Sequence, residues 1–279
     1  MKLPDRLDFT QSNLQDYVDC HYRFYLRYLL RTKWPALVVD DAIDFERRGQ
    51  TGARFHRLVQ QYLLKVPEKR LSDLAAADPD PNVAQWWDDF LAFVPPLLLG
   101  ERFVETILST SLHGRRLLAK YDLVLLKDNG QLLIFDWKTS RKQPRQAWLL
   151  DRVQTRLYRY ILTQAAANLT SGKKTDPEKV TMQYWFAPHP GTSITLPYSQ
   201  EEFTADGNYF TDLVDEIFTR PEGNFEKTSD LRECRYCVYR SHCDRGTEAG
   251  DLAGFEDFNL ETEDFDQELD FEEIEEIEF

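Results

Sequence analysis

An aspartate and a lysine two residues apart, Asp136 and Lys138, end a short apolar run that predicts a β-strand. Side chains two residues apart on a strand lie on the same face, so we expect these two groups to meet. Hydrolysis of a phosphodiester requires carboxylate oxygens that hold Mg²⁺ or Mn²⁺, and a cation or base near the attacking water. The pair can supply both functions. Taken alone, however, Asp-X-Lys also occurs by chance, with the aspartate solvated at the strand end.

The register of the predicted hairpin decides whether a second carboxylate joins Asp136. Asp128-Asn129-Gly130, between two apolar runs, is a strong hairpin signal. A two-residue loop would place Asp122 and Asp136 on opposite faces, whereas a three-residue loop would pair them directly, with Cβ atoms about 5 Å apart. Facing carboxylates repel each other unless a cation lies between them. The sequence therefore permits a shared metal only with the three-residue loop.

Three more polar side chains fall on predicted helices. His56 lies beside the apolar stripe of a helix expected over residues 50–66, where it could serve as a metal ligand. Gln154 and Tyr158 are four residues apart in a helix expected over residues 146–167, and therefore share one face. Each of the three, considered singly, is more often an ordinary packing or surface residue. Their order along the chain is more informative than any one of them.

That order resembles the PD-(D/E)XK nuclease superfamily, and specifically its RecB-type branch. The similarity covers about residues 8–245. It consists of a helical His motif, a Glu-bearing strand, an Asp-bearing strand, the Asp-X-Lys strand and a Gln-X-X-X-Tyr helix, which correspond to His56, Glu105, Asp122, Asp136 with Lys138, and Gln154 with Tyr158. Ala119 stands where the branch often has glycine, a departure that affects backbone packing more than chemistry.

The resemblance implies a role for most of these residues. It implies that Mg²⁺ or Mn²⁺ binds to three side chains and a backbone carbonyl, those of His56, Asp122, Asp136 and Trp137. Lys138 would orient or activate water and stabilise the charge that develops on the phosphate. Gln154 and Tyr158 would contact DNA near the scissile phosphate. The role of Glu105 is left open.

Four cysteines form a second candidate site. Cys234, Cys237 and Cys243 are closely spaced, and Cys20 lies more than 200 residues away on the first predicted helix. Four thiolates can hold tetrahedral Zn²⁺ or a [4Fe–4S] cluster, and ligand softness does not separate the two. Four unrelated buried cysteines are the alternative.

One N-terminal and three C-terminal cysteines resemble the iron–sulfur nucleases of the RecB-type branch, such as the AddB nuclease domain and the CRISPR-adaptation exonuclease. His21 replaces the proline usual after the first cysteine. The resemblance implies a [4Fe–4S] cluster, with zinc as the less favoured occupant. The cluster would join both ends of the nuclease domain, so its binding free energy would become folding free energy.

Basic residues after the Asp-X-Lys strand are candidates for DNA binding. Arg141, Lys142 and Arg145 lie in a polar loop. Three arginines at i, i+4 and i+7 of the following helix would form a basic stripe able to track a phosphate backbone, namely Arg152, Arg156 and Arg159. A solvated helix face is the alternative. Tryptophans that could stack on bases are more often core residues at these spacings, and they are Trp86, Trp87, Trp148 and Trp185.

Composition limits the class of protein. The chain has 279 residues and 42% hydrophobic residues, enough for a packed core, and no apolar run approaches the roughly 20 residues of a membrane helix. With no secretory signal visible and too few cysteines for a disulfide scaffold, we expect a cytoplasmic protein whose thiols are reduced or metal-bound. Residues 251–279 contain fourteen Asp and Glu without Lys or Arg, which leaves 34 acidic and 34 basic residues in positions 1–250. The net charge of −14 is a property of this segment and does not exclude a nucleic-acid partner.

The elements expected along the chain alternate in type. A first helix should run from a cap at Thr10 or Ser12 to about Leu30, and a last one over residues 201–219, with Ser199 and Glu202 as a capping box. Strands are expected over residues 103–112, 117–127, 131–137, 181–186 and 193–196. This pattern, with the resemblance, predicts an α/β fold: a restriction-endonuclease-like mixed sheet flanked by helices.

We expect a nuclease domain over residues 1–250, with a helical insertion over about 66–100, a cluster-binding segment over 231–245 and a disordered acidic tail over 251–279. The expected activity is that of a metal-dependent DNA exonuclease acting on single-stranded ends in repair, recombination or CRISPR adaptation, with a helicase or other protein as partner. The stretch 171–175 lacks the phosphate-binding loop spacing, so no helicase motor is expected. The alternatives are a non-catalytic DNA-binding or adaptor module and a zinc-stabilised interaction protein.

Overall fold

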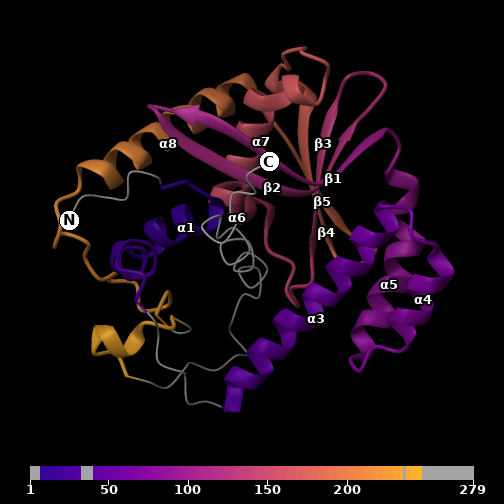
Figure 1. Cartoon of the computed structure of the whole chain (residues 1–279), viewed down its shortest axis with the longest axis horizontal. Helices are drawn as coiled ribbons and strands as arrows, with labels where there is room; N and C mark the ends of the chain where they lie inside the picture. The colour runs from indigo at the N-terminus through magenta and orange to yellow at the C-terminus, as the bar shows by residue number, and fades with distance from the viewer. Residues whose placement is uncertain (1–6, 33–39, 235–236, 247–279) are drawn as a thin grey trace, which may run out of the picture.

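A five-stranded sheet in the order β1-β2-β3-β4-β5 forms the centre of the protein (Figure 1). The computed structural model describes residues 7–32, 40–234 and 237–246. The strands are β1 (Glu101–Leu112), β2 (Arg115–Leu126), β3 (Leu132–Lys138), β4 (Val180–Phe186) and β5 (Ser193–Pro197). β3 and β4 run parallel, whereas the other neighbouring strands are antiparallel. A parallel pair needs a crossover connection, which the helical segment between β3 and β4 supplies.

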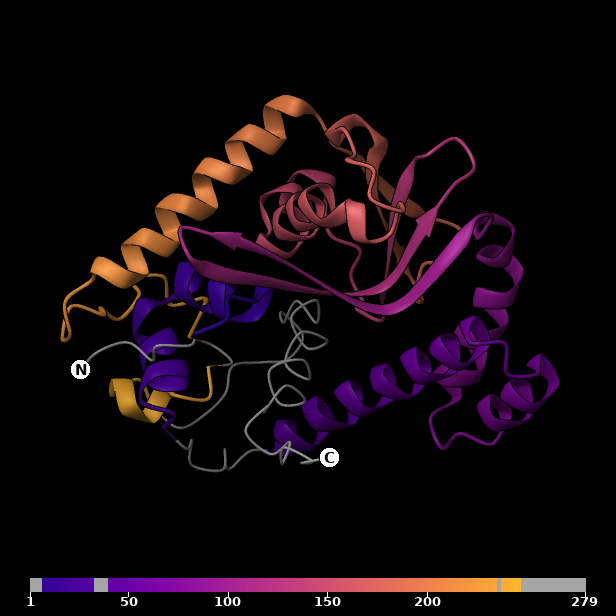
Figure 2. The same ribbon diagram turned by 45° about the horizontal axis from the view of Figure 1, so that its top comes forward.

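Helices cover both faces of the sheet (Figure 2). One face packs against α1 (Gln11–Asp19), α6 (Gln146–Asp151), α7 (Val153–Ala165) and α8 (Gln200–Thr219). The other packs against α3 (Asp40–Leu63), α4 (Glu68–Ala76) and α5 (Pro81–Phe93). Short 3₁₀ turns lie at Pro95–Leu97, Ala166–Asn168, Pro177–Lys179 and Arg240–Cys243. Because both faces are covered, every residue of β3 is buried, which explains its nearly continuous apolar sequence.

The expected α/β class is confirmed, and the five expected strands lie within a few residues of their predicted bounds. The capping box that begins α8 is also present, because the Ser199 side chain accepts from the Glu202 N–H and the Glu202 side chain accepts from the Ser199 N–H. Of the two caps considered for the first helix, Thr10 is the one used. Trp87 and Trp185 are fully buried core residues, as their spacing favours.

The single helix expected up to Leu30 is wrong. The backbone is extended at Cys20, with φ −162° and ψ 107°, and separates α1 from a short α2 (His21–Phe24) and a π-helical turn (Tyr25–Leu29). Arg23 reaches back across this break to Asp16 and Asp19, at 2.7 Å from each carboxylate. The break contains no glycine or proline, and these ion pairs connect the helices on its two sides.

Two other helix bounds differ from the prediction. The helix expected over residues 146–167 is divided into α6 and α7, because the backbone of Arg152 is extended. α3 begins at Asp40, ten residues before the expected start, since residues 40–49 carry many charges and no clear apolar period. The helical insertion over about 66–100 corresponds to α4, α5 and the turn that follows them.

The N-terminal helices lie beside the segment that follows α8 (Figure 1). Tyr22 N donates to Glu226 O at 3.1 Å, and the Tyr239 hydroxyl donates to Thr32 O at 3.2 Å. Arg220, at the C-terminal end of α8, donates from Nε to the Tyr17 hydroxyl at 2.7 Å. Residues about 200 positions apart thus form one structural unit.

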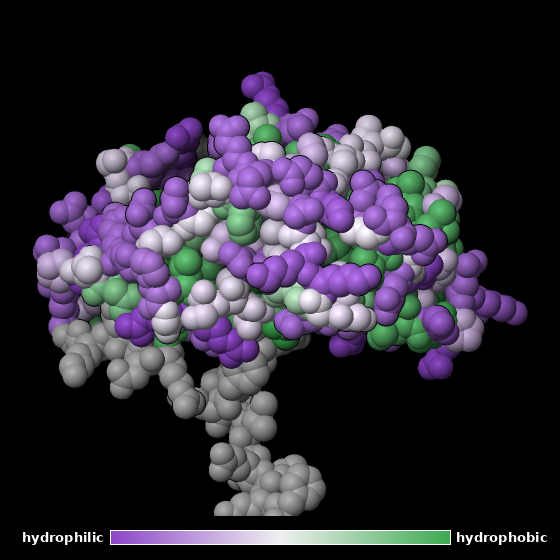
Figure 3. Space-filling model, turned by 90° about the horizontal axis from the view of Figure 1, so that it is seen from above, coloured by the Kyte–Doolittle hydropathy of each residue, from purple (hydrophilic) through white to green (hydrophobic). Residues whose placement is uncertain are grey.

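The face of the molecule shown in Figure 3 is largely hydrophilic, with apolar groups gathered toward one end. Exposed apolar side chains of the α4–α5 region include Leu74, Phe93 and Leu99. No helix within the described ranges is long and apolar enough to cross a membrane. The predicted acidic tail over residues 251–279 lies outside the described residues.

Candidate active site and cysteine pocket

The Asp-X-Lys pair is at the end of β3, as expected, with both side chains on one face. Asp136 and Lys138 are each only 3% exposed. Lys138 Nζ lies 2.9 Å from Asp136 Oδ1. On the other side of the carboxylate, Gln154 Nε2 from α7 donates to Asp136 Oδ2 at 2.7 Å. A buried carboxylate contacted at both oxygens has a fixed orientation.

The hairpin before Asp136 has the three-residue loop that a shared metal requires. Leu126 pairs with Leu132, and Gly130 adopts φ +78°, the left-handed conformation expected at the third loop position. Leu123 pairs with Phe135, so the same register places Asp122 across from Asp136. Of the two registers that the sequence left open, the structure therefore has the one that permits a shared metal.

Asp122 also connects β3 with the helix on the opposite face of the sheet. Its Oδ2 accepts from Trp137 N at 3.1 Å and lies 3.8 Å from His56 Nδ1 of α3. A Cβ on Gly52, one helical turn before His56, would lie 2.8 Å from Thr139 Oγ1. Only glycine at position 52 lets α3 approach the end of β3 so closely.

The side-chain alternation of β2 is interrupted at Asp122. Tyr121 and Val124 belong to the core on the α7 face, whereas Leu123 and Leu125 belong to the core on the α3 face. In a regular strand Tyr121 and Leu123 would share a face. The irregularity places the Asp122 carboxylate where groups from both helical layers can reach it.

Glu105 of β1 is the third carboxylate of this region. The pairs Val104–Leu123 and Thr106–Tyr121 place it across from Asp122, and its φ of 49° is unusual for a non-glycine residue. Lys120 Nζ lies 3.1 Å from Glu105 Oε2. Burial raises the pKa of the Asp122 carboxyl and the charge of Glu105 raises it further, while His56 and Lys138 oppose the shift.

α7 brings Gln154 and Tyr158 to this face, where both are nearly fully buried. The Tyr158 backbone carbonyl accepts from the Tyr121 hydroxyl at 2.9 Å. Sequence reasoning missed Tyr184, the β4 partner of Asp136, whose hydroxyl lies 2.8 Å from Thr155 Oγ1. The local sequence could not have identified it, because the strand partner of Asp136 is nearly 50 residues away and its pairing depends on the fold.

The carboxylates around Asp136 suit a divalent metal, because carboxylate oxygens bind Mg²⁺ or Mn²⁺. Within the described residues, however, no three His, Cys, Asp or Glu side chains are grouped closely enough to hold an ion. Lys138 and Gln154 contact the oxygens that an ion at Asp136 would use. The donors therefore fit the metal in chemical type, but the arrangement is not a preformed cage. The role of the Trp137 carbonyl stays a prediction.

All four cysteines line one pocket. Cys20 meets the C-terminal triplet Cys234, Cys237 and Cys243 there. Burial raises the pKa of the Cys237 thiol to about 11. Arg245 Nη1 donates to Cys234 Sγ at 2.6 Å. The convergence of these side chains fits a soft metal in chemical type, although within the described residues no three of them are grouped closely enough to hold an ion.

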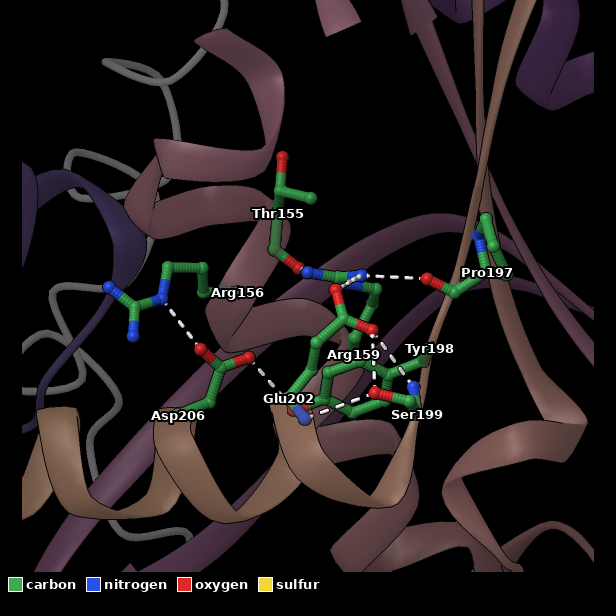
Figure 4. Close-up of polar contacts among 8 residues, drawn as sticks. All are labelled: Thr155, Arg156, Arg159, Pro197, Tyr198, Ser199, Glu202 and Asp206. Atoms are coloured by element: carbon green, nitrogen blue, oxygen red, sulfur yellow. Dashed lines mark hydrogen bonds and ion pairs between the residues drawn. The ribbon is translucent and has the colours of Figure 1, made fainter. Parts of the chain in front are cut away.

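The predicted arginine stripe on residues 152–159 is wrong. Arg152 precedes α7 in extended conformation, with its guanidinium 4.8 Å from the centre of the Trp148 ring. Arg156 Nε donates to Asp206 Oδ1 at 2.6 Å (Figure 4). Arg159 is 2% exposed.

Figure 4 shows the reason for the burial of Arg159. Its guanidinium donates to the carbonyls of Thr155 and Pro197 and lies 3.2 Å from Glu202 Oε1. Arg156 and Arg159 therefore join α7 to α8 and β5 instead of forming a surface for phosphates. In contrast, the loop residues Arg141, Lys142 and Arg145 are exposed directly after Lys138. His189 Nε2 contacts Arg141 O at 2.8 Å, which fixes this loop to the β4–β5 connection.

Comparisons with known proteins identify the family and the fold. The family model of the PD-(D/E)XK nuclease superfamily matches residues 8–244, and the chain belongs to that superfamily. A crystal structure from Eubacterium rectale named "putative exonuclease" is similar with a TM-score of 0.50 and 11% identity, covering 81% of this chain and 86% of that one. The crystal structure of SSO0001 is similar with a TM-score of 0.41 and 14% identity, covering 86% and 87%. Among curated proteins, none matches the chain significantly.

Proposed function

We propose that this nuclease is a Mg²⁺- or Mn²⁺-dependent deoxyribonuclease that degrades DNA from single-stranded ends. The observation that carries the proposal is the buried Asp136–Lys138 pair, with Asp122 across from it on the neighbouring strand. Burying an aspartate and a lysine is costly, and such groups are most often kept where they act on a substrate. Membership of the superfamily supplies the reaction class, and the placement of these side chains supplies the residues.

The proposed mechanism assigns one task to each group. Asp122 and Asp136, with His56, would hold the metal ion, which supplies positive charge to the phosphate and lowers the pKa of water when it is bound. Lys138 Nζ is 2.9 Å from Asp136 Oδ1, and from there it would hold the attacking water by a hydrogen bond. Gln154, which donates to Asp136 Oδ2 at 2.7 Å, would keep that carboxylate oriented for the metal and would contact the DNA near the scissile phosphate.

The choice of substrate rests on the loop after Lys138. Arg141, Lys142 and Arg145 are exposed there and can bind the phosphates that flank the scissile bond. The similar structure from Eubacterium rectale is named as an exonuclease, which supports exonuclease action. We place the activity in repair, recombination or CRISPR adaptation, where single-stranded ends arise, with a helicase or related protein as partner.

The cysteine pocket is proposed to hold a [4Fe–4S] cluster. Its support is the meeting of Cys20 with Cys234, Cys237 and Cys243 in one pocket. Zinc is the other occupant that four thiolates accept. Iron, sulfide and zinc analysis of anaerobically purified protein distinguishes the two.

The proposed activity is tested with end-labelled single- and double-stranded DNA in the presence of Mg²⁺ or Mn²⁺. We expect the wild type to shorten single strands from their ends, and Asp136→Ala to be slower by about a hundredfold or more. Asp89→Ala, in the helical layer and hydrogen-bonded to Gln85, is the control and should keep full activity. Circular dichroism must show that both variants are folded. Cleavage by folded Asp136→Ala protein at the wild-type rate would refute the site.

A further inference from the structure

Helix α7, which carries Gln154, begins without a capping side chain of its own. Its N-cap residue Arg152 provides no side-chain hydrogen bond. The first N–H groups of a helix have no partner within the helix and need an external acceptor. Val153 N donates to Oε1 of Gln15, which lies in α1, 138 residues earlier, at 3.2 Å. A glutamine from another helix thus caps α7.

The other end of the Gln15 amide is directed toward the cysteine pocket. Gln15 Nε2 donates to Asp19 Oδ1 at 2.7 Å. The second oxygen of Asp19 accepts from Arg23 Nη2 at 2.7 Å, and Arg23 lines the pocket. Asp19 is followed directly by Cys20. Whatever fixes the position of Cys20 therefore also fixes the carboxylate to which Gln15 is bound.

The residue that Gln15 caps, Val153, is followed directly by a residue of the proposed nuclease site. Gln154 follows Val153, and its Nε2 donates to Asp136 Oδ2 at 2.7 Å. Both side chains of this contact are almost completely buried, so the first turn of α7 cannot shift without changing it. An unbroken series of contacts thus joins the pocket with the catalytic carboxylate, through Arg23, Asp19, Gln15, Val153 and Gln154.

We propose that Gln15 is a positioning residue that couples metal binding in the cysteine pocket to the placement of Gln154 against Asp136. The inference rests on the proposed function, in that the pocket holds a metal centre and Asp136 belongs to the nuclease site. A centre bound through Cys20 fixes the end of α1, and α1 in turn fixes the start of α7. Coupling of this kind is reciprocal, so substrate or metal at Asp136 also stabilises the filled pocket.

The test is hydrogen–deuterium exchange of residues 153–158 in the wild type and in Gln15→Ala, each with its cysteine-bound metal and after removal of that metal. In the wild type, removal should speed exchange at the start of α7 severalfold. In Gln15→Ala, exchange should be fast in both states and should not respond to removal. A peptide from β1 should stay unchanged throughout, which separates local loosening from unfolding.

Two further variants separate coupling from packing. Gln15→Glu keeps an acceptor for Val153 N but loses the donor to Asp19, so α7 should stay protected in the loaded state and should no longer respond to metal removal. Gln164→Ala removes an α7 glutamine whose side chain donates to the Tyr160 hydroxyl, and it should behave as wild type. Rescue of the full response by Gln15→Glu would reduce Gln15 to a simple cap and overturn the coupling.

The outcomes are distinguishable. An equal response to metal removal in Gln15→Ala and in the wild type would overturn the proposal, and so would the absence of a response in the wild type. Wild-type protein without metal at its cysteines would refute the cluster as well, whereas an inactive wild type that holds metal and shows the expected exchange would refute only the nuclease assignment.

Discussion

Asp136 is constrained more tightly than a strand-end aspartate in solvent would be. Its two oxygens contact Lys138 and Gln154, and all three side chains are almost fully buried. A buried ion pair recovers the cost of desolvation only while both partners are present. Removing one member of the pair that is proposed to cleave DNA should therefore also destabilise the fold.

This predicts non-additive stability in a double-mutant cycle. Asp136→Ala and Lys138→Met should each lower the free energy of unfolding by about 3–5 kcal/mol, because each leaves a buried charge without its ion-pair partner. The double variant, which leaves neither charge, should lose less than the sum of the two and remain inactive. Urea unfolding of the four proteins measures the cycle. Strict additivity would show that the two charges do not interact in the folded protein.

Gly52 provides a prediction at a residue without chemistry of its own. Gly52→Ala places a Cβ 2.8 Å from Thr139 Oγ1, so either the Thr139 side chain or α3 must shift, and a shift of α3 would move His56. We expect weaker cleavage and a lower melting temperature, although alanine favours the helix by about 1 kcal/mol. Gly49→Ala in the same helix meets nothing within 4 Å and should be neutral or stabilising. Similar behaviour of the two variants in thermal unfolding and cleavage assays would contradict the close approach.

At the scale of elements, the sequence predicted those features that depend on neighbouring residues, such as the strands and the capping box of α8. The Asp128-Asn129-Gly130 loop and the period-2 strand reduced the hairpin to two registers, and the structure has the one that brings Asp122 across from Asp136. The breaks at Cys20 and Arg152 could not be predicted, because neither position has a glycine or proline. The side-chain contacts at the two breaks, Arg23 with Asp16 and Asp19 and Val153 N with Gln15, do not change the apolar period of the sequence. The exposure of Arg159 was mispredicted for a similar reason. A charged residue is expected at the surface, and the sequence does not show that α8 covers this one.

The break at Cys20 leads to a prediction about the cysteine pocket. Cys20→Ser should lose the bound metal and lower the melting temperature, because Cys20 is the pocket's N-terminal ligand candidate and metal binding adds to folding free energy. Metal content and thermal unfolding are measured together, with Cys243→Ser for comparison. If Cys20→Ser retains its full metal content while Cys243→Ser loses it, Cys20 is a plain core thiol.

For the whole molecule, charge is divided unevenly along the chain. Residues 251–279 carry fourteen acidic side chains, and the rest of the chain is neutral overall. This segment lies outside the described residues. A tethered polyanion would have an effective concentration of about a millimolar near its own domain, and would therefore compete with DNA for the exposed basic loop.

Truncation after Gly250 should therefore tighten DNA binding, most strongly at low salt, because screening weakens the competition as ionic strength rises. Affinity for a labelled single strand, measured for both proteins across a salt series, provides the check. The full-length and truncated proteins should converge at high salt. Equal affinities at every salt concentration would leave the segment a role in solubility or in docking a partner.

The contacts between the two ends of the folded region have a consequence for protein synthesis. During translation α1 and Cys20 emerge from the ribosome early. The residues that they contact or share a pocket with, Glu216, Arg220 and Cys234, emerge about 200 residues later. Until then Asp136 and Lys138 are already part of the nascent chain, but α1 lacks the contacts that hold it against α7. Incomplete chains would thus contain the nuclease motif without its support, so a destructive activity would mature only near the end of translation.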